Sequence, residues 1–306
     1  MKYQVIVSIF LLLSINEIKS KPFERHVELH YQKDHRNLTS ETKPFLHFSY
    51  EEWTLDGPSK WPGTCNTGHR QSPIAFDLVE PIIKNEIESL RMIGAYDAFP
   101  KEVHAINSGH SAAFSFVYKD DEVPQITGGP LHDEVYNFAS FHFHYPCEHL
   151  AVKYKDRCIL ELHFVHFNSK YLTIQNATNQ PDGLAVVAVL FEEIQWGSSQ
   201  WLPFLPMLHH VYEPDTDYTE RKLIFSYADA MGFTSFPKFI SYKGSLTTPA
   251  CSETVTWIVV DQLFLVAQYD MDKLQQVRDH DGFRIKRNNR PVQPINGRKV
   301  YLYDEF

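Results

Sequence analysis

The chain has 306 residues, of which 43% are hydrophobic and 22% are charged, and its formal net charge is −9 at pH 7. This composition is that of an ordinary globular protein with a sizeable core. The negative charge argues against nucleic acid or an anionic membrane as the main partner.

The first twenty residues, MKYQVIVSIFLLLSINEIKS, have the pattern of a secretory signal. Lys2 supplies a positive end, an apolar run follows, and Ser20 offers a small residue for cleavage. The apolar run is shorter than the roughly 18 residues that span a bilayer, and the C-terminus RKVYLYDEF has no anchor pattern. We therefore expect residues 1–20 to be a signal peptide and the product to be secreted, extracellular and free of a membrane anchor.

Residues 21–44 are polar and charged with little periodicity, which predicts a flexible leader. From residue 45 to residue 306, no composition break, low-complexity segment or repeat indicates a second domain. Runs rich in β-branched and aromatic residues predict strands at 111–118, 161–167, 184–191, 255–260 and 299–303. A helix is expected within 260–277. The pattern indicates a single, mostly β (α+β) domain around a large sheet.

Secretion changes how the cysteines and asparagines are interpreted. Cys65, Cys147, Cys158 and Cys251 are an even number in an oxidising compartment, which favours disulfides, and sequence alone permits three pairings. Asn37 and Asn176 begin Asn-X-Thr sequons and are candidate glycosylation sites.

The segment FHFHYPCEH at 141–149 places His142 and His144 on one face of a strand, because side chains alternate across a strand. In ELHFVHF, Glu161 and His163 share a face, whereas His166 has the opposite parity and is expected to be structural. If the two strands are antiparallel neighbours, three imidazoles meet. Three neutral nitrogens with an open fourth position are typical of a catalytic zinc site, and a carboxylate nearby can hold a ligand in place.

Two alternatives compete with a zinc site. A lone His-X-His pair in a half-buried strand more often consists of structural histidines whose hydrogen bonds are satisfied within the fold. Glu161 and His163, which share a face of the second strand, favour a metal instead. His142, His144 and Glu148 also fit the start of a cupin motif for iron or manganese. The glycine that a cupin requires is replaced by Lys155, and no downstream partner motif is apparent.

An ordered series of motifs resembles the alpha-class carbonic anhydrases, in particular the secreted type. The series comprises GPSKW (57–61), RQSPI (70–74), NSGH (107–110), GGPL (128–131), FHFHYPCEH, ELHFVHFN, PDGLAVVAV, SLTTP (245–249), VTWIVV and NRPVQP (289–294). The resemblance implies a large, twisted, mainly antiparallel central sheet with short peripheral helices.

The resemblance also assigns the metal site. It implies that His142, His144 and His163 bind Zn²⁺ and that Glu161 supports His163. Thr247 would orient the zinc-bound hydroxide and Glu148 would accept the proton of Thr247.

Further roles follow from the same resemblance. His110 matches the proton shuttle, with Tyr50 and Asn107 ordering the intervening waters. The pocket for carbon dioxide would be lined by Val165, Val186, Leu246, Thr248, Val255 and Trp257. Asn176 would lie at the cavity mouth.

Some positions depart from the family pattern. Ser140 stands where a glutamine commonly supports the first zinc ligand, Tyr145 replaces a usual tryptophan, and Ala112 and Ala113 follow the shuttle where larger or polar residues are common. None of these changes removes a ligand, so the resemblance implies an active enzyme.

The resemblance implies a disulfide between Cys65 and Cys251 that braces the threonine loop. Cys147 and Cys158 stay open between an internal bond, free thiols and an intermolecular bond. A simple hairpin turning near residues 153–156 would place Cys147 opposite the region of His163 rather than opposite Cys158.

The resemblance thus implies a secreted zinc lyase that hydrates carbon dioxide to bicarbonate and is inhibited by aromatic sulfonamides. Ester hydrolysis would be a side activity of the same hydroxide. The alternative function is a secreted binding or matrix protein on the same fold with weak or incidental catalysis. The sequence has no legible signature of oligomeric state.

Overall fold

A computed structural model describes residues 48–76, 83–85, 89–119, 122–151, 154, 156–199, 202–222 and 224–304, with only the backbone described for 83–85. The predicted signal peptide, the predicted leader, Asn37 and the first residues of the predicted domain, 45–47, lie outside the described residues.

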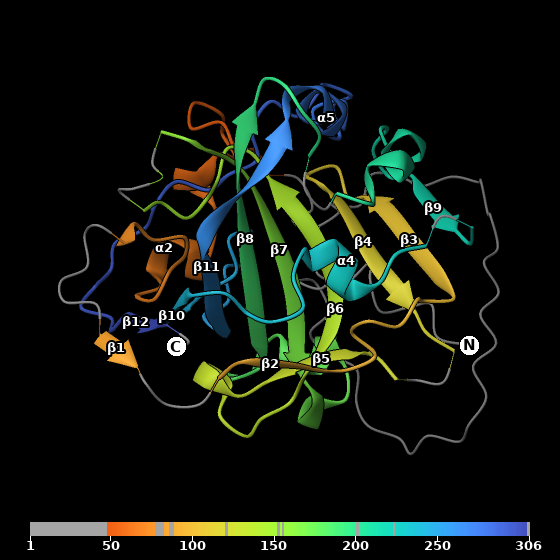
Figure 1. The fold of residues 1–306 in the computed structure, drawn as a ribbon. Coiled ribbons are helices and arrows are strands. Elements are labelled where there is room, and N and C mark those ends of the chain that lie inside the picture. The colour runs from red at the N-terminus through yellow and green to blue at the C-terminus, as the bar shows by residue number, and fades with distance from the viewer. Residues whose placement is uncertain are drawn as a thin grey trace, which may run out of the picture.

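A large mixed sheet dominates the described part of the chain and crosses the whole molecule (Figure 1). Its strands are β1 (Ile83–Asn85), β2 (Arg91–Gly94), β3 (Glu102–Asn107), β4 (Ala112–Val117), β5 (Pro124–Thr127), β6 (Tyr136–His144), β7 (Cys158–Asn168), β8 (Leu184–Ile194), β9 (Asp217–Glu220), β10 (Phe239–Gly244), β11 (Val255–Ala267) and β12 (Tyr301–Tyr303). The order is β1-β12-β10-β11-β8-β7-β6-β4-β3-β9, and β5 joins β2 to β6.

Most neighbouring strands are antiparallel, whereas β8 and β11, and also β1 and β12, run parallel. The predicted mostly β fold around a large sheet is therefore confirmed. Each of the five predicted strand segments overlaps a strand of this sheet.

The helix expected within 260–277 is shorter than that window. Strand β11 continues to Ala267, past a register shift between Val259 and Leu263, and only then does α5 (Gln268–Leu274) begin. The apolar run at the start of the 260–277 window pairs with β8 instead of forming a helix, because β-branched and aromatic side chains pack well on a pleated surface.

Helices in the described residues are short and peripheral. They are α2 (Thr64–Thr67), α3 (Ile174–Ala177), α4 (Tyr227–Met231), α5 and 3-10 turns at Pro58–Lys60, Gly129–Leu131, Ser169–Tyr171 and Leu205–His210. A capping box between Ser226 and Asp229 starts α4, and Gly232 ends it in the left-handed conformation. Where the chain is described, none of its helices has the length and apolarity needed to cross a bilayer.

The two faces of the central strands carry separate apolar clusters. Along β8, Val187 and Val189 belong to a larger cluster that includes Phe141, Phe143 and Phe164 and also contains Tyr227 of α4. The alternate residues Val186, Ala188 and Leu190 belong to the second cluster, which contains Trp257. This alternation leaves His142, His144 and His163 on the face of the second cluster, opposite α4.

Candidate metal centre

Strands β6 and β7 are antiparallel neighbours, and their register places His142 opposite His163 and His144 opposite Glu161. One ring nitrogen from each of the three histidines lies within 4.8 Å of the others. All three residues are buried: His142 is 6% exposed, His144 0% and His163 1%. The parity pattern of two short sequence segments therefore produces a compact, buried imidazole cluster.

Hydrogen bonds decide which nitrogen two of these rings present to the centre of the cluster. His144 donates from Nδ1 to the carbonyl of Asn288 at 2.6 Å, and His163 donates from Nε2 to Oε1 of Glu161 at 2.7 Å. The remaining nitrogens, Nε2 of His144 and Nδ1 of His163, therefore keep their lone pairs. Nε2 of His144 is buried and has no hydrogen-bond partner among the described residues.

Burial keeps the cluster neutral. It lowers the pKa of His142 well below its ordinary value, lowers that of His144 to about 4, and also lowers that of His163. Neutral imidazoles with inward lone pairs are the form that binds a metal ion.

Glu161 is a fully buried carboxylate whose oxygens are already occupied. They accept hydrogen bonds from Nδ1 of His149 at 2.6 Å, from His163, and from the backbone N–H groups of Glu148 and His149 at 2.7 and 2.8 Å. Burial alone would raise the pKa of Glu161, but its interactions with His149 and His163 bring that pKa well below its usual value. His149, Glu161 and His163 also lie close enough to hold an ion, but one there would have to displace these hydrogen bonds.

Glu148 lies beside the cluster, with one carboxylate oxygen 3.5 Å from Nδ1 of His144 and the other 3.9 Å from Nδ1 of His163. Burial raises its pKa to about 7 in spite of hydrogen bonds from the backbone of Arg290, at 2.7 Å, and from the Thr247 side chain. Thr247 and Thr248 are themselves buried, at 5% and 6% exposure. The structure therefore places Glu148, which is hydrogen-bonded to Thr247, next to His144 and His163.

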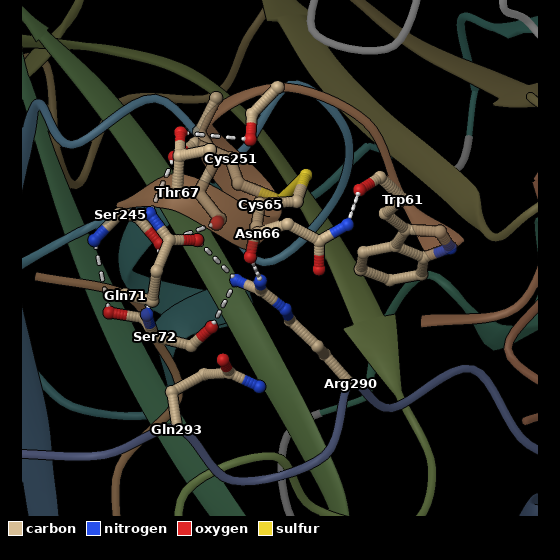
Figure 2. Close-up of a disulfide and its surroundings, with 12 residues drawn as sticks. Trp61, Cys65, Asn66, Thr67, Gln71, Ser72, Ser245, Cys251, Arg290 and Gln293 are labelled. Atoms are coloured by element: carbon tan, nitrogen blue, oxygen red, sulfur yellow. Dashed lines mark hydrogen bonds between the residues drawn. A yellow bond between two sulfur atoms is a disulfide. The ribbon is translucent and has the colours of Figure 1, made fainter. Parts of the chain in front are cut away.

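The loop that carries Thr247 is held by a disulfide between Cys65 and Cys251, whose Cα atoms are 4.9 Å apart (Figure 2). Figure 2 shows the guanidinium of Arg290 beneath this bond, where it donates to Gln71, to the carbonyl of Ser72 and to the carbonyl of Cys65. Since the backbone N–H of Arg290 also binds Glu148, one residue links the disulfide to the carboxylate.

A second disulfide joins Cys147 to Cys158, with Cα atoms 5.7 Å apart, which settles the open pairing in favour of an internal bond. The expectation that Cys147 would lie opposite the region of His163 is wrong because it assumed the wrong hairpin register. His144 pairs with Glu161. Cys147 comes three residues after His144 and Cys158 three residues before Glu161, so this register sets the two cysteines opposite each other. The bond closes the base of the loop that carries Glu148.

An apolar wall flanks the cluster. Val165 lies opposite Val186, and Val186 lies opposite Trp257, across three neighbouring strands. The Trp257 ring is 4.8 Å from the ring of His163, and its indole N–H donates to the carbonyl of Ser245 at 3.0 Å. All five apolar residues predicted for the pocket belong to the second apolar cluster: Val165, Val186, Leu246, Val255 and Trp257.

His110 follows β3 and is 6% exposed. Its ring stacks on Phe48 at 3.7 Å and lies 6.4 Å from the ring of buried Tyr50. Asn107 is fully buried, and its amide donates to the carbonyls of Tyr212 and Arg278 and accepts from the N–H of Gly109. The structure therefore gives the side chain of Asn107 three backbone partners that hold the His110 turn.

The remaining predicted positions are also described. Ser140 is 2% exposed and pairs with Val165 on β7, next to the strand segment of His142. Asn176 is exposed on α3, and its side-chain amide donates to the carbonyl of Tyr171.

Sequence reasoning assigned no role to Asn288, Arg290 or His149. The motifs NRPVQP and FHFHYPCEH contain Arg290 and His149, but their sequence gave no partner for either side chain. Asn288 holds His144 through its carbonyl, and its side chain binds the backbone of Tyr145, Phe143 and His110.

Comparison with known proteins identifies the family of the chain. The profile of the eukaryotic-type carbonic anhydrase family matches residues 56–304. Carbonic anhydrase 7 of Homo sapiens is 33% identical over 265 residues, covering 80% of this chain and 93% of that protein. Putative carbonic anhydrase 3 of Caenorhabditis elegans is 31% identical over 262 residues, covering 83% of this chain and 96% of that protein. Alpha carbonic anhydrase 3 of Arabidopsis thaliana is 29% identical over 277 residues, covering 88% of each of the two chains. The chain belongs to the eukaryotic-type carbonic anhydrase family.

Proposed function

We propose that this protein is a secreted zinc enzyme that interconverts carbon dioxide and bicarbonate. The observation that carries the proposal is the buried cluster of His142, His144 and His163 in a chain of this family. Three neutral imidazole nitrogens that leave a fourth position open are the donor set of a catalytic zinc site.

The fit to zinc rests on the atoms that face the centre of the cluster. Nε2 of His144 is buried without a hydrogen-bond partner among the described residues, and Glu161 holds His163 with its Nδ1 facing inward. When bound, zinc would lower the pKa of a water molecule from about 15.7 to about 7, an effect for which carbonic anhydrase is the standard example.

Thr247 and Glu148 would orient the nucleophile. The hydroxyl hydrogen of Thr247 is directed to the buried carboxylate of Glu148, so its oxygen is left as an acceptor. Thr247 would accept the hydrogen of a hydroxide held at the cluster and so direct a lone pair of that hydroxide at carbon dioxide. The apolar wall of Val165, Val186 and Trp257 would hold the uncharged substrate and exclude water from its far side.

Each hydration releases a proton, and His110 would carry it away. Imidazole has an ordinary pKa near 6.5, so it can accept and release a proton near neutral pH. Tyr50 packs beside His110 and would help to order the waters between His110 and the cluster. The amide of Asn107 holds the turn that presents His110.

Secretion is supported by the two disulfides, since such bonds persist in oxidising compartments. The exposed Asn176 would then carry a glycan, as would Asn37. Mass spectrometry of peptides from the secreted protein tests both sites, and unmodified peptides would contradict the assignment.

The deciding experiment is stopped-flow hydration of carbon dioxide by the purified protein, before and after removal of zinc. We expect rapid turnover that disappears with the metal, returns with zinc and is blocked by an aromatic sulfonamide. His144→Ala should lower zinc occupancy and activity together. Slow turnover at one full equivalent of zinc would instead favour a binding or matrix protein on this fold.

A further inference from the structure

A second histidine lies beside the predicted proton shuttle. The rings of His110 and His280 are 5.2 Å apart between centroids and meet edge to face at 80°. At this separation the ring edges are within reach of one hydrogen bond or one bridging water. Both rings line the same cavity of about 280 Å³, which also touches Phe48 and Tyr50.

The two histidines differ in access to solvent. His110 is 6% exposed, and one face of its ring is covered by Phe48 in a stacked contact at 3.7 Å. The side chain of His280 is 25% exposed. A buffer molecule can therefore reach His280 more easily than it can reach His110.

His280 sits on a turn with a fixed shape. Asp279 accepts hydrogen bonds from the backbone of Asp281 and Phe283, and Arg278 donates to the carbonyl of Gly282. The amide of Asn107 binds the carbonyl of Arg278, which ties this turn to the turn of His110.

The two turns are in close contact at Gly109, whose positive φ also favours glycine. Gly109 has a φ of +77°, and a Cβ built on it would lie 2.3 Å from Nε2 of His280. The imidazole of His280 therefore packs directly on the backbone that precedes His110.

Charged groups surround this pair. Oδ2 of Asp215, on the loop before β9, lies 3.6 Å from Nδ1 of His280, and the Asp215 side chain is 80% exposed. Other ionisable residues lining the cavity are Tyr50, Glu51, Asp279, Asp281, Arg284, Lys286 and Arg287. The Asp215 side chain therefore lies at the solvent-facing side of His280.

We propose that His280 is a second proton carrier, which takes the proton from His110 and passes it to buffer. This proposal rests on the proposed function. In each cycle the His110 imidazolium gives up its N–H proton to a ring nitrogen of neutral His280, directly or through one water. His280 then releases a proton to a buffer base, and both rings return to the neutral form.

The test compares His280→Gln with wild type in stopped-flow hydration of carbon dioxide, in weak and in concentrated buffer. In weak buffer we expect kcat to fall on the order of tenfold, because proton release then limits turnover. The value of kcat/KM should stay unchanged, since it reports attack on carbon dioxide, and added imidazole should restore kcat. His209→Gln, at an exposed histidine on the Leu205–His210 turn, is the matched control and should behave as wild type.

A double-variant cycle distinguishes a relay in series from two separate routes. If His280 acts after His110, then His110→Ala/His280→Gln should be no slower than His110→Ala alone. Equal losses in kcat and kcat/KM for His280→Gln would mean a structural role and would overturn the relay. An unchanged kcat in weak buffer, or additive losses in the double variant, would also overturn it. A zinc-loaded wild type that is slow even in concentrated buffer would overturn the proposed function itself, and the relay with it.

Discussion

Hydrogen bonds around single residues decide what the histidine cluster can do. Asn288 and Glu161 each accept a hydrogen bond from the outward N–H of one imidazole, so that the inward nitrogen of His144 and of His163 is an acceptor. The same imidazoles without these partners could adopt either tautomer. The partners therefore contribute as much to a metal site as the histidines themselves.

The hydroxyl of Thr247 gives the first residue-scale prediction. Thr247→Val keeps the shape of the side chain but removes the hydrogen bond to Glu148, so the nucleophile loses its fixed orientation. We expect kcat/KM for carbon dioxide hydration to fall on the order of a hundredfold. Thr254→Val is the control, because that hydroxyl binds the carbonyl of Thr178 instead, and equal rates in the two variants would contradict the role of Thr247.

His166 gives a prediction about acid stability. It is fully buried on the face opposite the cluster, bonds to the hydroxyl of Tyr227 at 2.9 Å, and has its pKa lowered by burial to about 3. The unfolded chain binds a proton at this histidine below about pH 6.5, whereas the folded chain does not. Folding stability is therefore unaffected above pH 6.5 and decreases as the pH falls from there toward 3.

At pH 5 this single histidine should lower the free energy of unfolding by about 2 kcal/mol. Urea unfolding of wild type and His166→Gln at pH 7 and pH 5 measures the effect. We expect the variant to lose less stability than wild type between the two pH values, and parallel losses would contradict the assignment.

At the scale of elements, the register between β6 and β7 determines both the site and one disulfide. The pair His144–Glu161 places His142 opposite His163, and the same register brings Cys147 to Cys158. A shift by one residue would turn the histidines to the opposite face of the sheet. The alternation of phenylalanine and histidine in β6 prevents this shift, because the phenylalanines pack in the larger apolar cluster.

The two disulfides close loops of very different length, with sequence separations of 186 and 11 residues. The chain-entropy relation gives upper limits of about 5 kcal/mol for Cys65–Cys251 and about 3 kcal/mol for Cys147–Cys158. We therefore expect Cys65→Ser/Cys251→Ser to lose more stability in urea than Cys147→Ser/Cys158→Ser. The reverse order would mean that folded-state contacts, rather than loop closure, dominate.

At the scale of the whole molecule, a bound metal would couple the site to folding. The ligands come from β6 and β7 in the centre of the sheet, so unfolding would destroy the site. Zinc at a thousandfold excess over its dissociation constant should stabilise the fold by about 4 kcal/mol. Thermal unfolding of the zinc-free and reloaded protein measures this shift, and His144→Ala should remove most of it; an equal shift in that variant would place the zinc elsewhere.

Much of the architecture could be predicted because it follows from local patterns. The strand segments, the shared face of His142 and His144 and the opposite parity of His166 all come from alternation within a few residues. The ordered motifs identified the family, which the profile match confirms. These features depend on neighbours in the chain, and the sequence alone therefore determined them.

Only the tertiary structure decided features that depend on segments far apart in the chain. The sequence showed that four cysteines could pair, but the register of β6 and β7 selected Cys147–Cys158. It contained His280 without any sign that this ring packs on Gly109 beside His110. Contacts of this kind are set by the packing of the whole sheet and its loops, and no local pattern encodes the distance between two such segments.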